Sequence, residues 1–443
     1  MNNLRRYVTQ LMGYPTAVLG LLMIIALIGV AMYTVITIPY ERAIDLWRGH
    51  EESWAENPRN AKPKWVNYFR DGQLPETLVM RTQDPQASRI EQDLEGIRLV
   101  TATLSFDYHY DDFPSEVILF FTSKAEEQRP FVATTWILPD GRRIETDAQA
   151  LASQQRVYLG LDNRVKRALG QVPAEIGLFS DQSGQLLKGT YQVEIQGYLF
   201  EESSDFDAKL VVYGKVHGWA GTDHMRRDLM VALMWGAPLA LAFGLLAALG
   251  STIATFIISA IGAWYGGWVD ALIQRITEIN LILPVMPVLI MVGTLYSRSI
   301  WTMLGVVILL SIFGGGIKTY RSVFLQIKTA PYMDAARAYG ASNMRLIFRY
   351  MIPRMIPVLI PSFITSIPSF VFLEASLALL GLGDPTLPTW GKLLQDAFSN
   401  GAIFKGHYYW ILEPAVLLMI TGLSFAMVGF ALDRIFNPRL RGL

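Results

Sequence analysis

The strongest constraint on the fold is a set of six stretches that carry no charged residue and are long enough to cross a lipid bilayer. These stretches run from Tyr7 to Tyr40, Leu229 to Val269, Ile279 to Ser297, Ser299 to Ile317, Met355 to Leu373, and Pro414 to Leu432. A helix needs about 20 residues to cross roughly 30 Å of hydrocarbon, where every backbone polar group must find a partner within the protein. The pattern predicts an α-helical membrane protein with six transmembrane helices, at residues 15–38 and at about 231–262, 276–297, 300–320, 354–378 and 410–432.

The first stretch follows Arg5 and Arg6, as an N-terminal signal peptide also would. The apolar region of a cleaved signal peptide is only about 7–15 residues long, and the stretch here is longer. We therefore expect an uncleaved membrane anchor, preceded by a cytoplasmic segment at residues 1–14.

Charge divides the chain into two parts and predicts its orientation. Residues 39–231 hold 22 basic and 30 acidic residues, whereas the remainder holds 16 basic and 8 acidic residues. The connector 318–354 has seven basic residues and one acid, and the C-terminal tail is also basic, with Arg434, Arg439 and Arg441. Because Lys and Arg near span ends are retained in the cytoplasm, we expect both termini and this connector inside a plasma or inner membrane, and residues 39–231 outside it.

The acidic region is too long for a structureless loop, so we expect an inserted domain at residues 39–219. Residues 98–110 alternate apolar and polar side chains, which is typical of a half-buried strand. Further strands are predicted at 116–122, 131–138, 143–146, 190–200 and 208–216, with a turn at Pro139-Asp140-Gly141 and a helical interruption at about 147–168. The pattern favours an extracytoplasmic, mainly-β, sandwich-like domain.

Catalytic and metal-binding patterns are missing from the sequence. The chain has no cysteine, and its five histidines, at 50, 109, 217, 224 and 407, do not have the spacing of a zinc site. The two Gly-Lys pairs, at 214–215 and 391–392, lack the glycine five residues earlier that a nucleotide-binding P-loop needs. We expect no catalytic residue, no metal site and no cofactor on this chain, and no nucleic-acid partner.

The basic connector 321–353 predicts a pair of helices outside the membrane. Pro331 suits the opening of a short helix, and Asp334 suits its positive N-terminal end. Gly340 suits a left-handed stop, after which Ser342 or Asn343 can cap a second helix that runs until just before Pro353.

At these residues the chain resembles the permease subunits of ABC-type importers, in particular the dipeptide, oligopeptide and nickel group. The cytoplasmic signature of that family, the EAA motif, has Glu-Ala-Ala, a Gly four residues after the second Ala, and Ile-x-Leu-Pro after nine further residues. This chain has Asp334-Ala335-Ala336, Gly340 and Tyr350-Met-Ile-Pro353. It departs from the signature by Asp for Glu, Tyr for Ile and Ile for Leu.

The resemblance covers about residues 220–441 and the first span. Gly221-Thr-Asp-His-Met-Arg-Arg-Asp228 is similar to the Gly-Thr-Asp-x-x-Gly-Arg-Asp segment of the group, with Arg226 where Gly is usual. Trp264-Tyr-Gly-Gly-Trp-Val-Asp270, Glu374-Ala-Ser-Leu-Ala-Leu-Leu-Gly-Leu-Gly383 and Asn437-Pro-Arg-Leu-Arg441 are similar to later motifs. The inserted domain has no counterpart in the usual member.

The resemblance implies a type I ABC importer permease fold and a subunit that breaks no bonds itself. It implies a second homologous permease subunit, two cytoplasmic ATPase subunits that carry ATP and Mg, an extracytoplasmic substrate-binding protein and surrounding membrane lipid. The residues expected to dock the ATPase and transmit its closure are Asp334, Ala335, Ala336, Arg337, Gly340 and Pro353.

Glu374 lies near the outer end of a predicted span and has two interpretations. As an intramembrane carboxylate it is a candidate pathway or gate residue that meets a substrate amine. Alternatively, it reaches the outer interface or bonds to backbone groups freed by Pro361 and Pro368.

Several functions fit the sequence besides import of dipeptides, oligopeptides or related small solutes. The same scaffold imports metal chelates, such as nickel complexes, or oligosaccharides in other cases, and no residue discriminates among these cargoes. A membrane-anchored receptor that acts through its outer β-domain needs only one span, and an ion-coupled carrier needs more ionisable residues within its spans. The inserted domain either positions the binding protein or shields the entry, or it serves as a spacer or stabilising extension.

Overall fold

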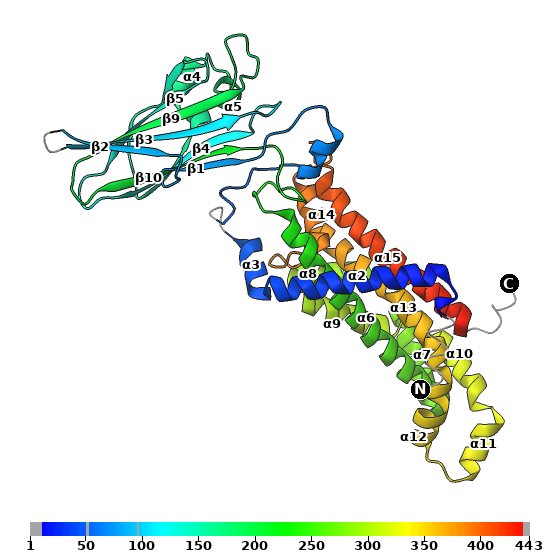
Figure 1. Ribbon diagram of the computed structural model, residues 1–443. Coiled ribbons are helices and arrows are strands. Elements are labelled where there is room, and N and C mark those ends of the chain that lie inside the picture. Colours follow the sequence, from blue (N-terminus) through cyan, green and yellow to red (C-terminus); the bar gives the residue numbers. More distant parts are fainter. Residues whose placement is uncertain (1–10, 50–52, 95–96, 437–443) are drawn as a thin grey trace. The chain divides into compact units, whose positions relative to one another are not determined.

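The computed structural model describes residues 11–49, 53–94 and 97–436, and it separates into two units (Figure 1). The helical unit comprises the residues up to Arg48 and those from Val231 onward, and the second unit is Gly49–Met230. The boundary lies after residue 48 rather than at the expected residue 39, because α3 (Tyr40–Arg48) packs on the helical unit. There Ala43 is buried, and the rings of Tyr40 and Trp235 lie 5.8 Å apart.

Four continuous helical stretches among the described residues are long and apolar enough to cross a membrane. They are α2 (Pro15–Thr37), α6 (Leu229–Tyr265), the stretch Asn343–Leu382 and α15 (Tyr409–Phe436). Two bent pairs pass the same test together, namely α7 (Gly267–Ile282) with α8 (Val285–Leu295), bent by 78°, and α9 (Ile300–Ile312) with α10 (Gly316–Lys328), bent by 45°. If each pair is one span the number rises to six, so the six-span count stays a prediction.

The prolines explain where these helices break and where they continue. Leu283 is extended and Pro284 precedes α8 as its N-cap, so the single helix expected at 276–297 is wrong. The residue before a proline is driven out of the helical region, which accounts for this break. In α13 (Ile352–Leu377), by contrast, Pro361 stays inside a continuous helix, and the hydroxyl of Thr365 donates to its carbonyl at 3.0 Å.

The long helices approach one another closely where glycines lie between them. A Cβ added to Gly20 of α2 would lie 2.7 Å from the Ser424 carbonyl of α15, and one added to Gly429 would lie 2.4 Å from the Thr365 side chain of α13. Without a difference in hydrophobicity between lipid and helix, such close packing drives helix association in a bilayer. These contacts fix α2 and α13 on α15 (Figure 1).

The second unit contains two antiparallel sheets packed face to face. One sheet has the order β2-β3-β9-β5-β6, with β7 on β5, and the other has the order β1-β10-β4-β8. The strands are β1 (Leu78–Arg81), β2 (Ser88–Leu94), β3 (Ile97–Tyr108), β4 (Glu116–Lys124), β5 (Phe131–Ile137), β6 (Arg143–Glu145), β7 (Gln149–Ala150), β8 (Gln154–Tyr158), β9 (Gly189–Leu199) and β10 (Asp205–Tyr213). The expected β-sandwich is therefore present.

The core between the two sheets is rich in aromatic side chains. Trp136 and Phe179 are buried with ring centroids 5.7 Å apart, and Phe106 and Tyr191 stack at 5.4 Å. Along β3 the burial alternates residue by residue from Val100 onward, as the sequence pattern predicts for a strand with one face on the core.

The helical interruption expected at 147–168 is wrong over most of its length. Residues 154–158 form the edge strand β8, followed by the short helices η2 (Leu159–Leu161) and α4 (Asn163–Ala168). Asp162 caps α4 by accepting from the backbone N–H groups of residues 164 and 165. Pairing with β4 decides the conformation of residues 154–158.

The remaining helices are short and complete the description of the two units. They are η1 (Lys64–Phe69) and α5 (Ala174–Gly177) in the second unit, and α11 (Pro331–Ala338), α12 (Asn343–Arg345), η3 (Leu346–Met351), η4 (Ala378–Leu382) and α14 (Trp390–Ser399) in the helical unit. The strands β1, β2, β7 and β8 were not expected from the sequence.

Candidate coupling site

The helix pair expected in the basic connector is present. Helix α11 begins at Pro331, and Asp334 lies in its first turn. Gly340 then adopts φ +79°, a left-handed conformation that favours glycine, and Ser342 precedes α12 in an extended conformation. The sequence thus produces a helix, a sharp turn and a second helix.

The second helix does not end before Pro353, which corrects the sequence expectation. Helix α12, the π-helical segment η3 and α13 form one continuous stretch from Asn343 to Leu382 with η4. A proline ring clashes with the carbonyl four residues earlier in an α-helix, and the wider π-helical turn before Pro353 accommodates it. The second helix of the connector is therefore continuous with the predicted span at 354–378.

Helix α11 has one buried face and one exposed face. Met333 and Ala336 are buried within the protein's own core, whereas Asp334, Ala335 and Arg337 are exposed. The buried face packs in a cluster that includes Phe256, Ala260, Trp264, Tyr320, Phe324, Leu346, Ile347, Met351 and Met355. Of the residues expected to dock a partner, Ala336 instead holds the helix on this cluster.

The C-terminal end of α6 is held by two cationic side chains, Lys328 and Arg337, and the sequence predicted neither contact. The ammonium of Lys328 donates to the carbonyls of Ala263 and Trp264 at 3.0 and 2.6 Å. The guanidinium of Arg337 lies 5.1 Å from the centre of the Trp264 ring. A cation at a helix C-terminus satisfies its last carbonyls and its dipole, so Lys328 joins the end of α10 to α6, and Arg337 joins α11 to α6.

The Trp264 to Asp270 motif turns the chain between α6 and α7. Gly266 and Gly267 have φ values of +65° and +52°. The Asp270 carboxylate forms a bidentate ion pair with Arg321 of α10, in which one N···O distance is 2.6 Å. Such a fork geometry fixes orientation as well as distance. The connector is thus held by α6, α7 and α10 together.

Glu374 lies in α13 and is buried, with 6% of its surface exposed. Its carboxylate accepts a hydrogen bond from the hydroxyl of Thr389, the residue that caps α14. Helix α14 itself packs closely, because the indole of Trp390 donates to the Leu233 carbonyl at 2.8 Å. The structure therefore brings Glu374 against helix α14, and its role in the pathway stays a prediction.

The segment Gly221 to Asp228 is a compact turn that starts α6. Asp223 is fully buried and accepts from the Arg227 guanidinium at 2.6 Å, and Asp228 accepts from the backbone N–H of Met230 at 2.9 Å. Burial raises the pKa of the Asp228 carboxyl, and the Met230 hydrogen bond opposes this rise. An acid at this position caps the first turn of α6.

Arg226 occupies an unusual backbone conformation in this turn. Its φ is +65°, it is buried, and its guanidinium lies 4.1 Å from the centre of the Tyr213 ring. The guanidinium also donates to the Asn57 carbonyl at 2.7 Å and forms an ion pair with Glu116 of β4. The position that the resemblance assigns to glycine therefore has a backbone conformation that favours glycine. Here the Arg226 side chain binds to other residues of the second unit, Gly49–Met230, which we call the β-domain.

Some residues that the sequence singled out fall outside the part of the chain that the structure describes. The Asn437 to Arg441 motif lies outside the described residues, as do Arg5, Arg6 and His50. Over the described ranges, no group of three or more His, Asp or Glu side chains has metal-binding geometry.

Comparison with known proteins places the helical unit. Residues 240–442 match the family of binding-protein-dependent transport system inner membrane components. The chain is 29% identical over 226 residues to the dipeptide transport system permease protein DppC of Bacillus subtilis, which covers 50% of this chain and 69% of that protein.

Two further relatives match over the same share of the chain. The oligopeptide transport system permease protein OppC of Bacillus subtilis is 29% identical over 227 residues, which are 50% of this chain and 72% of the relative. The glutathione transport system permease protein GsiD of Pectobacterium atrosepticum is 27% identical over 226 residues, which are 50% of this chain and 73% of the relative. Residues 240–442 of this multi-pass membrane protein are thus similar to the inner membrane components of binding-protein-dependent transport systems.

Proposed function

We propose that this chain is the membrane-spanning permease subunit of an ATP-driven importer for dipeptides, oligopeptides or related small solutes. The names of its relatives support the cargo class. The observation that carries the coupling role is helix α11, whose exposed face presents Asp334, Ala335 and Arg337 while its other face is buried on α6.

The contacts of α11 support a mechanism in which movement of α11 is transmitted to the membrane helices. An ATPase that moves α11 moves Trp264 and the C-terminal end of α6 with it, because Arg337 of α11 contacts the Trp264 ring and Lys328, three residues before α11, bonds to the last carbonyls of α6. The continuity of η3 with α13 gives the same motion a second route into the membrane. Coupling requires that the rigid contact binds the nucleotide states of its partner differently.

The complex that we propose contains a second homologous permease subunit, two cytoplasmic ATPase subunits and an extracytoplasmic substrate-binding protein. ATP and Mg bind on the ATPase subunits, and this subunit breaks no bonds. The basic connector and both termini face the cytoplasm, and the β-domain faces the outside, in accordance with the distribution of Lys and Arg.

A pair of variants at one position tests the coupling role. A Cβ at Gly340 meets no atom within 4 Å, so only the backbone conformation at φ +79° restricts this site. Asn tolerates the left-handed region, whereas a β-branched residue is a strong outlier there. We expect Gly340→Val to lose the ATPase in a tagged pull-down from solubilised native membranes, and Gly340→Asn to retain it.

The outcomes are distinct. The proposal is supported if a P-loop ATPase and a second permease co-purify with the wild type and with Gly340→Asn, and if Gly340→Val loses the ATPase. If no ATPase co-purifies with the wild type, or if both variants retain it equally, the α11 segment does not dock an ATPase. Uptake of labelled dipeptides by proteoliposomes that contain the purified complex and ATP then tests the cargo.

A further inference from the structure

Four aromatic side chains are exposed close together on the β-domain. Three of them belong to η1, in which Tyr68 is 84% exposed, Phe69 is 82% exposed and Trp65 is 38% exposed. The fourth is Trp219, which is 75% exposed and whose carbonyl accepts from the indole N–H of Trp65 at 3.0 Å. The rings of Trp65 and Phe69 meet edge to face, with centroids 6.3 Å apart. We call these four residues the aromatic patch.

The helix η1 is held by polar contacts, and its aromatic side chains do not anchor it in the core. All six of its residues are described, three of them are aromatic, and none is buried. At its start the N–H of Lys64 donates to the Gly218 carbonyl at 2.9 Å. The side-chain amide of Asn67 exchanges two hydrogen bonds with the backbone of Leu74, at 3.1 and 3.2 Å. The polar contacts fix η1 in place and leave its rings on the surface, where clustered apolar side chains mark an interaction site.

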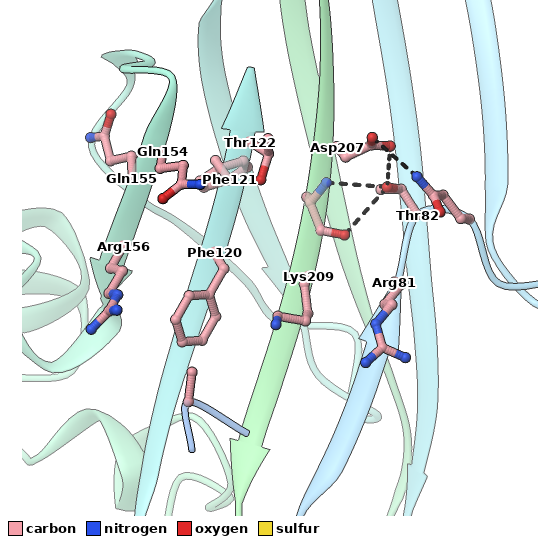
Figure 2. A pocket seen from close by; sticks show the side chains of 13 residues that line it. Arg81, Thr82, Phe120, Phe121, Thr122, Gln154, Gln155, Arg156, Asp207 and Lys209 are labelled. Carbon is pink, nitrogen blue, oxygen red and sulfur yellow. Dashed lines mark hydrogen bonds between the residues drawn. The ribbon is translucent and has the colours of Figure 1, made fainter. Parts of the chain in front are cut away.

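A groove on the outer face of the four-stranded sheet shows the opposite arrangement. It has a volume of about 670 Å³, and polar side chains line most of it (Figure 2). One oxygen of Glu56 accepts from Arg81 at 2.7 Å and from Lys209 at 3.0 Å. The Asp207 carboxylate accepts from the hydroxyl of Thr82 at 3.3 Å (Figure 2). These groove side chains bind one another, whereas the aromatic patch presents its rings to the surroundings.

Backbone hydrogen bonds place the aromatic patch beside the start of α6. The N–H of Leu229, the first residue of α6, donates to the carbonyl of Gly221 at 3.1 Å, and Gly221 lies two residues after Trp219. Leu229 also begins the charge-free stretch that makes α6 long and apolar enough to cross a membrane. Between the patch and this stretch along the chain, Met225 and Met230 are exposed apolar side chains as well. The patch therefore lies at the end of the β-domain from which the chain enters a membrane helix.

We propose that the aromatic patch inserts into the lipid headgroup region of the bilayer surface at which α6 begins, and thereby anchors the β-domain on the membrane. Trp and Tyr favour this region because their rings are apolar while the indole N–H and the phenol O–H need polar partners. The apolar face of a helix that lies on a membrane is buried about 5–10 Å deep, at the boundary between headgroups and acyl chains.

Lipid fits the patch better than a partner protein does, because the patch is continuous along the backbone with the start of α6, where lipid surrounds the chain. A partner protein is the alternative occupant that the experiment must separate from lipid. The proposal rests on the membrane helix α6 and does not depend on the proposed transport function.

The chain has no cysteine, so a nitroxide label can be attached to a single introduced one. Tyr68→Cys and Phe69→Cys each place a label in the patch and leave the other three aromatic residues unchanged. Leu161→Cys is the matched control, because Leu161 is an exposed apolar residue of η2 in the same domain. The full chain is reconstituted in nanodiscs of phosphatidylcholine and phosphatidylglycerol. Power-saturation EPR then measures the access of each label to oxygen, which concentrates in lipid, and to a nickel chelate, which stays in water.

We expect the labels at positions 68 and 69 to be accessible to oxygen and to lose most of their access to the nickel chelate, while the label at position 161 stays accessible to the chelate. The proposal is overturned if the labels at 68 and 69 reach the chelate as well as the label at 161 does, because water then covers the patch. It is also overturned if they are shielded from both reagents, because protein then covers the patch.

A second labelling experiment tests whether the four residues act as one anchor. Trp219→Cys carries the label, alone and together with Tyr68→Ser and Phe69→Ser. The carbonyl of residue 219 that accepts from Trp65 belongs to the backbone and remains in this variant. We expect the label at 219 to be shielded from the chelate in the single variant and to gain access to it in the triple variant. Equal access in the two variants overturns the proposal, because η1 then does not hold this surface in the lipid.

Discussion

Arg226 gives a quantitative test of how the turn before α6 is held on the β-domain. Its φ of +65° costs an L-residue roughly 1–2 kcal/mol that glycine does not incur. Against this cost stand a hydrogen-bonded ion pair to Glu116, worth about 1.5–3 kcal/mol, and a contact with the Tyr213 ring, worth about 1–2 kcal/mol. Glu116 is 31% exposed, so water replaces part of what is lost when the guanidinium is removed.

Two substitutions separate these contributions. Arg226→Ala removes the contacts and keeps the unfavourable φ, so we expect the β-domain to lose about 2–4 kcal/mol of unfolding free energy. Arg226→Gly removes the same contacts and relieves the backbone, but it also makes the unfolded chain more flexible by about 0.5–1 kcal/mol. We therefore expect Arg226→Gly to lose only about 1–3 kcal/mol and to be more stable than Arg226→Ala.

The assay is pulse proteolysis of the full chain in nanodiscs across a urea series, which reports the fraction of β-domain that is unfolded at each concentration. The order of midpoints should be wild type, Arg226→Gly, Arg226→Ala. If Arg226→Gly is at least as stable as the wild type, the ion pair and the ring contact contribute no more than the backbone relief that glycine brings, and the larger values assigned to them are refuted. If the two variants have equal midpoints, the argument from backbone conformation fails.

Three further predictions concern particular contacts. Glu201 accepts the backbone N–H groups of residues 126–128, which lower its pKa, so its contribution to stability is present above its ordinary pKa and is lost as the pH falls through the lowered value. Urea midpoints at pH 7 and pH 3.5 should therefore show a larger loss from Glu201→Gln at pH 7. A Cβ at Gly197 would lie 2.1 Å from the ring of Phe206, so Gly197→Ala should destabilise the β-domain by about 1–3 kcal/mol in the same proteolysis assay. Lys328→Gln removes the cation from the last carbonyls of α6, and should lower substrate-stimulated ATP hydrolysis of the purified complex while the ATPase still co-purifies.

The features that the sequence alone determined are those that depend on neighbouring residues. The lengths of the uncharged stretches marked the membrane helices. The alternation of apolar and polar residues from Val100 onward marked the strand β3. Pro331 and Gly340 set the start of α11 and the turn after it, because fixed φ and tolerance of positive φ are properties of single residues.

Other features were decided only by the tertiary structure, because they depend on partners far away in the sequence. Residues 154–158 became a strand through pairing with β4, and the helix through Pro353 continued because a π-helical turn accommodates the proline ring. Arg226 finds Glu116 across 110 positions, which no local pattern reveals. Strand register likewise aligns Arg156 of β8 with Arg81 of β1 through two intervening strands, and register between distant strands is a property of the folded sheet.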